Sequence, residues 1–222
     1  MSTTIAFDVY GTLIDTHGIV SELQIMVGDI ATTFSHTWRE KQLEYSFRRG
    51  LMKKYETFAV CTSNALDYTC ASYDIDLTEE QKNNLLLSYQ SLPAFKDAEE
   101  SLSKLKSNNC RLFAFSNGTT NAVDTLLVKA NIRDYFHGVV SVGDLKSFKP
   151  NPAVYEYFLK VADTNKNNTW LISSNSFDVI GAISSGIRAV WVKRSEKAVF
   201  DPWGIEPTIT VNDLNGLYAI IN

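Results

Sequence analysis

Six short apolar runs, each ending in a polar or glycine-containing turn, constrain the fold of this chain most. The first spans residues 3–7, stops at Asp8 and turns through Gly11. The others span residues 111–115, 138–142, 169–172, 188–192 and 207–211. Runs of roughly four to eight apolar residues bounded by turn residues are typical of buried parallel strands. The sequence therefore predicts a buried parallel sheet.

Helix-like segments lie between most of these runs. Apolar side chains recur at helical spacing in residues 98–107, 121–130, 152–162 and 177–185. Alternation of strand and helix predicts a Rossmann-like, doubly wound α/β core. In such folds ligands bind beyond the carboxyl ends of the strands. The polar side chains expected at that edge are Asp8, Ser116, Lys149 and Ser173.

Residues 15–95 follow a different pattern. The stretch is rich in aromatic residues at helical spacing and contains no convincing strand. Within it, residues 77–81 are typical of a capped helix start. Because it lies between the first two predicted strands, it indicates a helical cap inserted into the α/β core. We expect a core domain of residues 1–14 and 97–222 and a cap domain of residues 15–96. The alternative is one continuous domain with additional helices.

Charge and composition exclude several classes of protein. The 222 residues include 21 Lys and Arg against 25 Asp and Glu, so no broad cationic field favours nucleic acid or an anionic membrane as a partner. A hydrophobic share of 45% and a charged share of 21% are typical of globular chains. No run of about 18 apolar residues predicts a membrane span, and no signal peptide is visible. We expect a soluble cytoplasmic protein.

The three cysteines, Cys61, Cys70 and Cys110, agree with that location. Their number is odd, and neither a Cys-x-x-Cys pair nor a suitable histidine spacing indicates a zinc site. Reduced thiols are therefore favoured over a framework of disulfide bonds.

Residues 7–12, with the sequence FDVYGT, carry the first chemical signal. Asp8 would present a carboxylate at the edge of the sheet, where turn groups can bind one oxygen and leave the other free to attack an electrophile. Taken alone, Asp-x-x-Gly-Thr is also an ordinary turn, so this interpretation depends on the rest of the chain.

Three further blocks follow in order. They are WREKQLEY at residues 38–45, FSNG at residues 115–118, and KP at residues 149–150 with SSNSFD at residues 173–178. Together with FDVYGT they resemble the haloacid dehalogenase superfamily, and more narrowly its L-2-haloacid dehalogenase branch, over nearly the whole chain. The resemblance implies an (S)-2-haloacid dehalogenase, which converts short (S)-2-haloalkanoic acids to (R)-2-hydroxy acids with inversion through an aspartyl ester.

The resemblance also implies catalytic roles. Asp8 would attack C2 of the haloacid and displace the halide, and water would then hydrolyse the ester at the Asp8 carboxyl carbon. Lys149 would keep Asp8 ionised, since a nearby cation favours a carboxylate. Asp178 would pair with Lys149 and help to activate the water, with Ser173 and Asn175 fixing that network.

Binding roles follow from the same resemblance. Thr12 and Ser116 would bind the substrate or nucleophile carboxylates. Arg39, Asn117 and Phe177 would hold the halide. The residues implied to shape or brace the pocket are Tyr10, Leu43, Phe58 and Tyr155. Each of these positions has a structural alternative, because a charged side chain can be solvated and an aromatic ring can simply belong to the core.

Two features disfavour the phosphatases of the same superfamily. Those enzymes place a second aspartate two residues after the nucleophile, where this chain has Tyr10, a poor general acid at neutral pH. They also bind Mg²⁺ with an acidic pair after the fourth strand, where residues 173–175 are SSN. A halide leaving group needs neither a proton nor a metal, so we expect no cofactor. A phosphatase remains the alternative function, and a catalytically silent interaction protein is a third.

Two positions depart from the family pattern. Glu40 follows Arg39 where the family often has an uncharged residue, and its carboxylate could pair with Arg39 or point away. Phe177 stands where some members have tryptophan, which would remove an indole N–H donor.

The resemblance also implies a homodimer, for which the aromatic-rich residues 34–55 are the candidate surface. A small 2-haloacid is the expected substrate.

Overall fold

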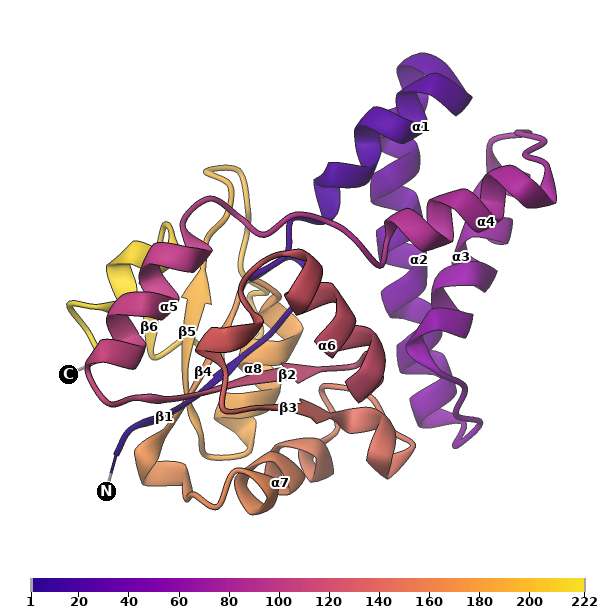
Figure 1. Cartoon of the computed structure of the whole chain (residues 1–222). Coiled ribbons are helices and arrows are strands. Elements are labelled where there is room, and N and C mark those ends of the chain that lie inside the picture. The colour runs from indigo at the N-terminus through magenta and orange to yellow at the C-terminus, as the bar shows by residue number, and fades with distance from the viewer. Residues whose placement is uncertain (1, 222) are drawn as a thin grey trace.

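The computed structural model describes residues 2–221 and contains the predicted sheet (Figure 1). Its strands are β1 (Thr4–Phe7), β2 (Arg111–Ser116), β3 (Gly138–Ser141), β4 (Thr169–Ser173), β5 (Arg188–Val192) and β6 (Ile209–Val211). Each coincides with one of the predicted apolar runs, and all pairings are parallel. The strand order is β3-β2-β1-β4-β5-β6, so the prediction of a Rossmann-like α/β sheet is confirmed.

Three strands are shorter than predicted, and one of them is β1, which begins at Thr4, one residue after the start of its apolar run. The third apolar run extends to Val142, but β3 ends at Ser141 and the 3₁₀ turn Val142–Leu145 follows. The Ser141 hydroxyl accepts a hydrogen bond from the N–H of Gly143, which favours a turn over continued pairing. β6 is an edge strand, and the predicted run begins with Pro207, which has no N–H to donate to a neighbouring strand.

Alternate residues of the central strands contribute to two apolar layers. The core helices are α5 (Ala98–Ser107), α6 (Thr120–Lys129), α7 (Pro152–Val161) and α8 (Ser176–Ser184). Ile5 and Phe7 of β1 belong to the apolar cluster that includes α5 and α6, whereas Ala6 belongs to the cluster that includes α7 and α8. All residues of β1 are buried. Helices thus cover both faces, as a parallel sheet requires.

Four helices lie between β1 and α5 along the chain. They are α1 (Val20–Val27), α2 (Ala31–Leu51), α3 (Phe58–Ser72) and α4 (Glu79–Ser88). Figure 1 shows them beside the α/β layers as a separate helical group, with α2 and α3 packed against each other. The predicted helix start is present, because Thr78 and Gln81 form a capping box at the beginning of α4. None of the helices in the described part of the chain is long and apolar enough to cross a bilayer.

The two connections between the helical group and the sheet run side by side. Ile14 and Ala94 form an antiparallel bridge, and the Phe95 N–H donates to the Leu13 carbonyl (2.8 Å). Arg194, which follows β5, lies over the Phe95 ring, with its guanidinium carbon 3.9 Å from the ring centroid. Its Nη2 also donates to the carbonyl of Thr12 (2.5 Å). This arrangement fixes the loop after β1, which begins with Asp8.

Candidate active site

Asp8 lies directly beyond β1, beside the point where the strand order reverses. Its backbone N–H donates to the carbonyl of Ile172 in β4 (2.9 Å), which extends the parallel pairing by one residue. The residue is 8% exposed. Open α/β sheets bind their ligands at such a reversal. The carboxylate is therefore held in a mostly buried position at the edge where ligands are expected.

The two oxygens of the Asp8 carboxylate have different surroundings. Oδ2 accepts three hydrogen bonds, from Thr12 Oγ1 (2.8 Å), Ser173 Oγ (3.1 Å) and Asn175 Nδ2 (2.7 Å). Oδ1 lies 3.2 Å from Lys149 Nζ, its one side-chain hydrogen-bond partner within residues 2–221. The protein thus holds Oδ2 firmly and leaves lone pairs of Oδ1 available for chemistry.

Lys149 is a buried cation between two carboxylates. Its side chain is 1% exposed, and Nζ donates to Asp8 Oδ1 (3.2 Å), Asp178 Oδ2 (2.8 Å) and the carbonyl of Phe115 (2.8 Å). An ammonium has three N–H donors, so these contacts satisfy all of them. The ammonium also lies 4.2 Å from the centroid of the Phe115 ring. Burial and complete pairing fix its position next to the Asp8 carboxylate.

Asp178, in the first turn of α8, is the second carboxylate of this network. It is fully buried, and its Oδ1 accepts a hydrogen bond from the hydroxyl of Tyr155 (2.8 Å). Burial raises the pKa of the Asp178 carboxyl; the charge of Lys149 opposes this shift and that of Asp8 adds to it. Burial, with the charge of Asp178, also raises the pKa of Tyr155, so the phenol remains a donor.

Ser116 is the last residue of β2, Asn117 follows it, and both are buried. The Ser116 hydroxyl accepts a hydrogen bond from the N–H of Gly118 (3.1 Å). The side-chain oxygen of Asn117 accepts one from the backbone N–H of Lys149 (2.9 Å). Asn117 thus fixes the backbone that carries the lysine, and its side-chain NH₂ group remains a donor.

Arg39 comes from α2 and is half-buried. Its Nη1 donates to Gln42 Oε1 (2.5 Å), and its Nη2 donates to the carbonyl of Tyr10 in the loop after β1 (3.4 Å). Asn175 donates to the same carbonyl (3.1 Å). The helical group therefore delivers a cation to the loop that carries Asp8. Glu40 points away from it, because its carboxylate is exposed and pairs with another side chain of α2.

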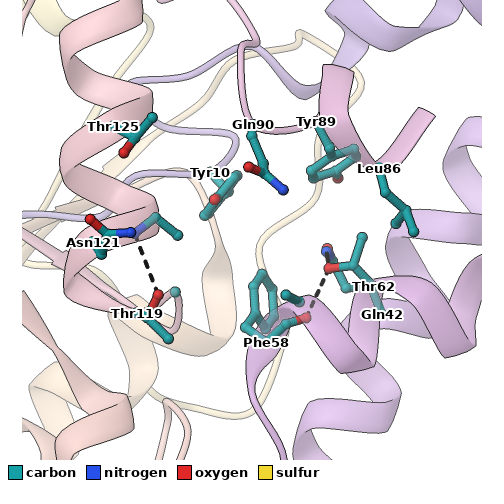
Figure 2. A pocket seen from close by; sticks show the side chains of 13 residues that line it. Tyr10, Gln42, Phe58, Thr62, Leu86, Tyr89, Gln90, Thr119, Asn121 and Thr125 are labelled. Carbon is teal, nitrogen blue, oxygen red and sulfur yellow. Dashed lines mark hydrogen bonds between the residues drawn. The ribbon is translucent and has the colours of Figure 1, made fainter. Parts of the chain in front are cut away.

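Apolar side chains surround Tyr10. Its ring lies 5.9 Å from that of Phe58 and 6.1 Å from that of Tyr89. Leu43 packs on the small cluster that contains Phe58. Figure 2 shows Tyr10 and Phe58 in the wall of a cavity of about 270 Å³ between the helical group and α6. Burial raises the pKa of Tyr10, so its phenol is a weak proton donor at neutral pH.

Phe177, in the first turn of α8, is half-buried. Its ring packs edge-to-face on that of Phe47 in α2, with centroids 5.0 Å apart. Phe177, Phe47 and Lys149 line a second cavity, of about 480 Å³, between α2 and the core. Phe47 was not among the residues expected in the site.

Hydrogen bonds and ion pairs join the predicted catalytic residues into one network. The side chains in that network are Asp8, Thr12, Lys149, Tyr155, Ser173, Asn175 and Asp178. Asn117 joins through the backbone of Lys149, and Arg39 through the carbonyl of Tyr10. The described contacts do not link the side chains of Ser116, Leu43, Phe58 or Phe177 to the Asp8 carboxylate, so these residues form the surroundings of the network.

The donor set does not suit a divalent cation. Mg²⁺ prefers several charged oxygen ligands, and the Asp8 and Asp178 carboxylates share the ammonium of Lys149 instead. Among residues 2–221 no group of three or more His, Cys, Asp or Glu side chains could hold a metal ion. The cation next to the Asp8 carboxylate is therefore the ammonium of Lys149.

Comparison with known proteins agrees with this arrangement. The family model for haloacid dehalogenase-like hydrolases matches residues 3–186. The chain belongs to this family. It is 33% identical to the (S)-2-haloacid dehalogenase of Pseudomonas sp. (strain YL), over 97% of this chain and 93% of that protein. It is also 33% identical to haloacetate dehalogenase H-2 of Moraxella sp. (strain B), over 98% of this chain and 96% of that protein.

A solved structure of this haloacid dehalogenase-like family has the same fold. It is the L-2-haloacid dehalogenase of Xanthobacter autotrophicus with chloropropionic acid covalently bound. The TM-score is 0.91 at 26% identity, and the match covers 100% of this chain and 98% of that chain. The predicted membership of the haloacid dehalogenase superfamily is thus confirmed.

Besides Phe47, sequence reasoning missed three residues beside the site of this dehalogenase-like hydrolase. Gln42 contacts Arg39, and a helical spacing of three residues could have indicated that contact. Ser174 Oγ donates to the carbonyl of Gly11 (2.7 Å) and ties the turn after β4 to the turn after β1. Tyr89 stacks on Tyr10 from a separate part of the chain, and no local pattern indicates that contact.

Proposed function

We propose that this protein is an (S)-2-haloacid dehalogenase that hydrolyses short (S)-2-haloalkanoic acids to (R)-2-hydroxy acids. The observation that carries the proposal is the unequal binding of the Asp8 oxygens, with three donors on Oδ2 and one ammonium beside Oδ1. The (S)-2-haloacid dehalogenase of Pseudomonas sp. (strain YL), similar over nearly the whole chain, supports the same activity.

In the proposed first step, Asp8 Oδ1 attacks C2 of the haloacid from the side opposite the halogen. The new C–O bond forms as the carbon–halogen bond breaks, and the halide leaves with the bonding electron pair, so C2 is inverted. Thr12, Ser173 and Asn175 hold Oδ2 and so aim the carboxylate. Lys149 stabilises the ionised nucleophile before the attack.

In the proposed second step, water attacks the carboxyl carbon of the Asp8 ester. The bond between that carbon and Oδ1, which is now bonded to C2, breaks, and its electron pair leaves with the oxygen of the hydroxy acid. Asp178 accepts the first proton of the water, with Tyr155 and Lys149 holding it in place, and passes it to this leaving oxygen, so that the (R)-2-hydroxy acid departs. The second proton of the water goes to solvent, and its oxygen remains in the ionised carboxylate of Asp8. The sum of both steps is haloacid plus water giving hydroxy acid, halide and a proton.

Anion binding completes the proposal. Arg39 and Asn117 are the donors assigned to the departing halide, with Phe177 at its apolar side, and Ser116 is assigned to the substrate carboxylate. The apolar walls are Tyr10, Leu43 and Phe58. A halide needs donors around a developing anion and no proton, which agrees with the buried, weakly acidic phenol at position 10.

We further propose that residues 1–14 and 97–222 form the core domain and residues 15–96 the cap domain. The paired connections at Ile14 and Ala94 support these boundaries. We also propose a homodimer and a cytoplasmic location. The free cysteines Cys61, Cys70 and Cys110 support a reducing compartment.

The decisive experiment measures halide release from (S)- and (R)-2-chloropropionate in the presence of EDTA. We expect chloride and (R)-lactate from the (S) enantiomer alone. Asp8→Asn should reduce turnover to background, whereas Asp67→Asn, which alters an exposed ion pair of the helical group, is the matched control and should retain activity. Absence of chloride from a folded wild-type protein, with magnesium-dependent hydrolysis of p-nitrophenyl phosphate instead, would favour the phosphatase.

The ester intermediate has its own test. A single turnover in water enriched in ¹⁸O should place the label in Asp8, and mass spectrometry of the peptide that contains residues 7–12 should detect it. Label found only in the hydroxy acid would show that water attacks C2 directly and that no ester forms.

A further inference from the structure

No carboxylate neutralises the charge of Arg39. Within residues 2–221 the recorded ion pairs do not include Arg39, and the two carboxylates nearest to it along α2, Glu40 and Glu44, pair with other side chains. Its hydrogen-bond acceptors are the amide oxygen of Gln42, the carbonyl oxygen of Tyr10 and the hydroxyl of Tyr89, which are all uncharged. The guanidinium therefore keeps its full positive charge for an anion.

Gln42 is the buried side chain that holds this guanidinium. It is 1% exposed, and both ends of its amide are used. Its Oε1 accepts from Arg39 Nη1 (2.5 Å), and its Nε2 donates to Thr62 Oγ1 (2.5 Å). Thr62 Oγ1 in turn donates to the carbonyl of Phe58 (2.8 Å). Figure 2 shows Gln42 and Thr62 next to each other at the edge of the cavity, with the bond from Thr62 to Phe58 as a dashed line.

The chain of hydrogen bonds has one possible direction. The Phe58 carbonyl can only accept, so the hydroxyl proton of Thr62 points toward it. Thr62 must then accept from Gln42, which turns the NH₂ group of the amide toward Thr62 and its oxygen toward Arg39. The indole of Trp38 also donates to the carbonyl of Thr62 (2.9 Å), which fixes α3 against α2.

We propose that Gln42 is a positioning residue that aims Arg39 at the anion of the reaction without cancelling its charge, and so sets the affinity for substrate and halide. This inference rests on the proposed dehalogenase function of the same site. A neutral acceptor is what this role needs. A carboxylate at position 42 would hold the guanidinium equally well but neutralise it, and an apolar side chain would release it.

The primary test compares Gln42→Met and Gln42→Glu in steady-state kinetics with (S)-2-chloropropionate and in product inhibition by chloride. A hydrogen bond to a charged group contributes substantially to the free energy that holds the group in place. Gln42→Met should therefore raise KM and the chloride inhibition constant by roughly tenfold, with a smaller effect on kcat. Gln42→Glu should raise both constants at least as much, although it preserves the acceptor. A purely structural glutamine would instead lower the melting temperature of both variants and leave the KM and the chloride inhibition constant of the folded protein unchanged.

Variants of Thr62 test the next link of the chain. Thr62→Ser keeps the hydroxyl and should leave KM near the wild-type value. Thr62→Val removes the hydroxyl at similar volume, so it should raise KM in the same direction as Gln42→Met but by less. Equal KM values for the two variants would contradict a role for this link.

A double-mutant cycle separates positioning from general destabilisation. In an Arg39→Lys background, Gln42→Met should add little further increase in KM, because its effect is transmitted through the guanidinium. Gln81→Met is the matched control. It removes a glutamine that caps α4 and should lower the melting temperature without a change in KM.

Two results would overturn the inference. One is a folded Gln42→Met protein with wild-type KM and chloride inhibition, and the other is full additivity with Arg39→Lys. Chloride affinity measured by isothermal titration calorimetry gives the same comparison without turnover. A wild-type protein that binds chloride but releases none from the haloacid would refute the proposed function, while the calorimetric difference between wild type and Gln42→Met still decides this inference.

Discussion

At the scale of single residues, the two buried carboxylates have different surroundings. Asp8 has four polar partners, whereas Asp178 has Lys149 and Tyr155 and is completely enclosed. Since burial raises the pKa of Asp178, its proton is lost at a higher pH than that of an ordinary aspartate. In the proposed mechanism, Asp8 is the nucleophile and Asp178 is the proton acceptor.

The raised pKa of Asp178 predicts the pH dependence of turnover. If this carboxylate must be ionised to accept a proton, kcat should fall on the acid side at a pH above the usual aspartate range. We expect kcat measured between pH 4 and pH 9 to show this limb in the wild type. Asp178→Asn should lower kcat and remove the limb, and an unchanged limb in that variant would assign it to another group.

The same shift predicts a dependence of stability on pH. Between the ordinary pKa of aspartate and the raised one, the folded protein binds more protons at Asp178 than the unfolded chain does. The contribution of this group to the free energy of unfolding should therefore decrease as pH rises through that window. Urea unfolding at several pH values should show a steeper decrease for the wild type than for Asp178→Asn. A slope of equal size in both proteins would contradict the assignment.

Removal of the buried ammonium should be costly. Lys149→Met leaves Asp8 and Asp178 together without their cation, and breaking a buried charge pair costs about 3–5 kcal/mol. We expect turnover to fall to background and the free energy of unfolding to fall by about that amount, measured in urea. Lys146→Met, a change to an exposed lysine three positions earlier, is the control and should preserve both. Wild-type stability of Lys149→Met would contradict the central role of this pairing.

The network around Asp8 was largely predictable because several of its residues lie at or just beyond strand ends, and parallel strands bring their ends to one edge. Asp8, Ser173 and Asn175 are of this kind. Tyr89 was not predicted, since its contact with Tyr10 depends on how the chain after α4 packs on the loop after β1. Gln42 was missed although its contact with Arg39 lies within one helix. The sequence pattern alone could not decide whether Glu40 pairs with Arg39 or points away from it, because the exposure of a side chain depends on the neighbouring helices.

At the scale of elements, strands were easier to place than their ends. The apolar runs located all six strands, but β3 ends before Val142 and β6 begins after Pro207 because local hydrogen bonds decide where pairing stops. The start of α4 was predictable from its capping residues alone, since a capping box is formed entirely by local contacts.

That capping box gives a prediction for one helix. Thr78→Ala removes the hydroxyl that accepts from the backbone of Gln81 and should lower the free energy of unfolding by about 1 kcal/mol. KM and kcat should not change, because α4 is capped at the end remote from Tyr89. Thr78→Ser is the control and should retain stability. A large change in KM would show that the cap of α4 and the site are coupled.

At the scale of the whole molecule, the proposed homodimer is the prediction that depends least on local sequence patterns. Of the aromatic side chains on α2, Phe34 and Trp38 are buried and Phe47 packs on Phe177, so packing within the chain uses much of the apolar surface that suggested an interface. Exposed apolar side chains remain at the end of α2, at Leu51 and Met52. The candidate surface is therefore narrower than residues 34–55.

Light scattering at working concentration tests that proposal. We expect a mass of twice that of the chain, and Leu51→Glu combined with Met52→Glu should shift it toward the monomer if this end of α2 lies in the interface. Val199→Glu, on another exposed apolar side chain, is the control and should leave the mass unchanged. A monomer in the wild type would refute the homodimer.

All side chains that hold the Asp8 carboxylate come from the sheet and its loops, whereas Arg39 arrives on a helix from the insertion between β1 and β2. In the proposed mechanism the nucleophile therefore comes from the core alone, whereas the halide site combines Asn117 and Phe177 of the core with Arg39 of the insertion. A change in the insertion would alter the halide site without a change in the groups that hold the nucleophile.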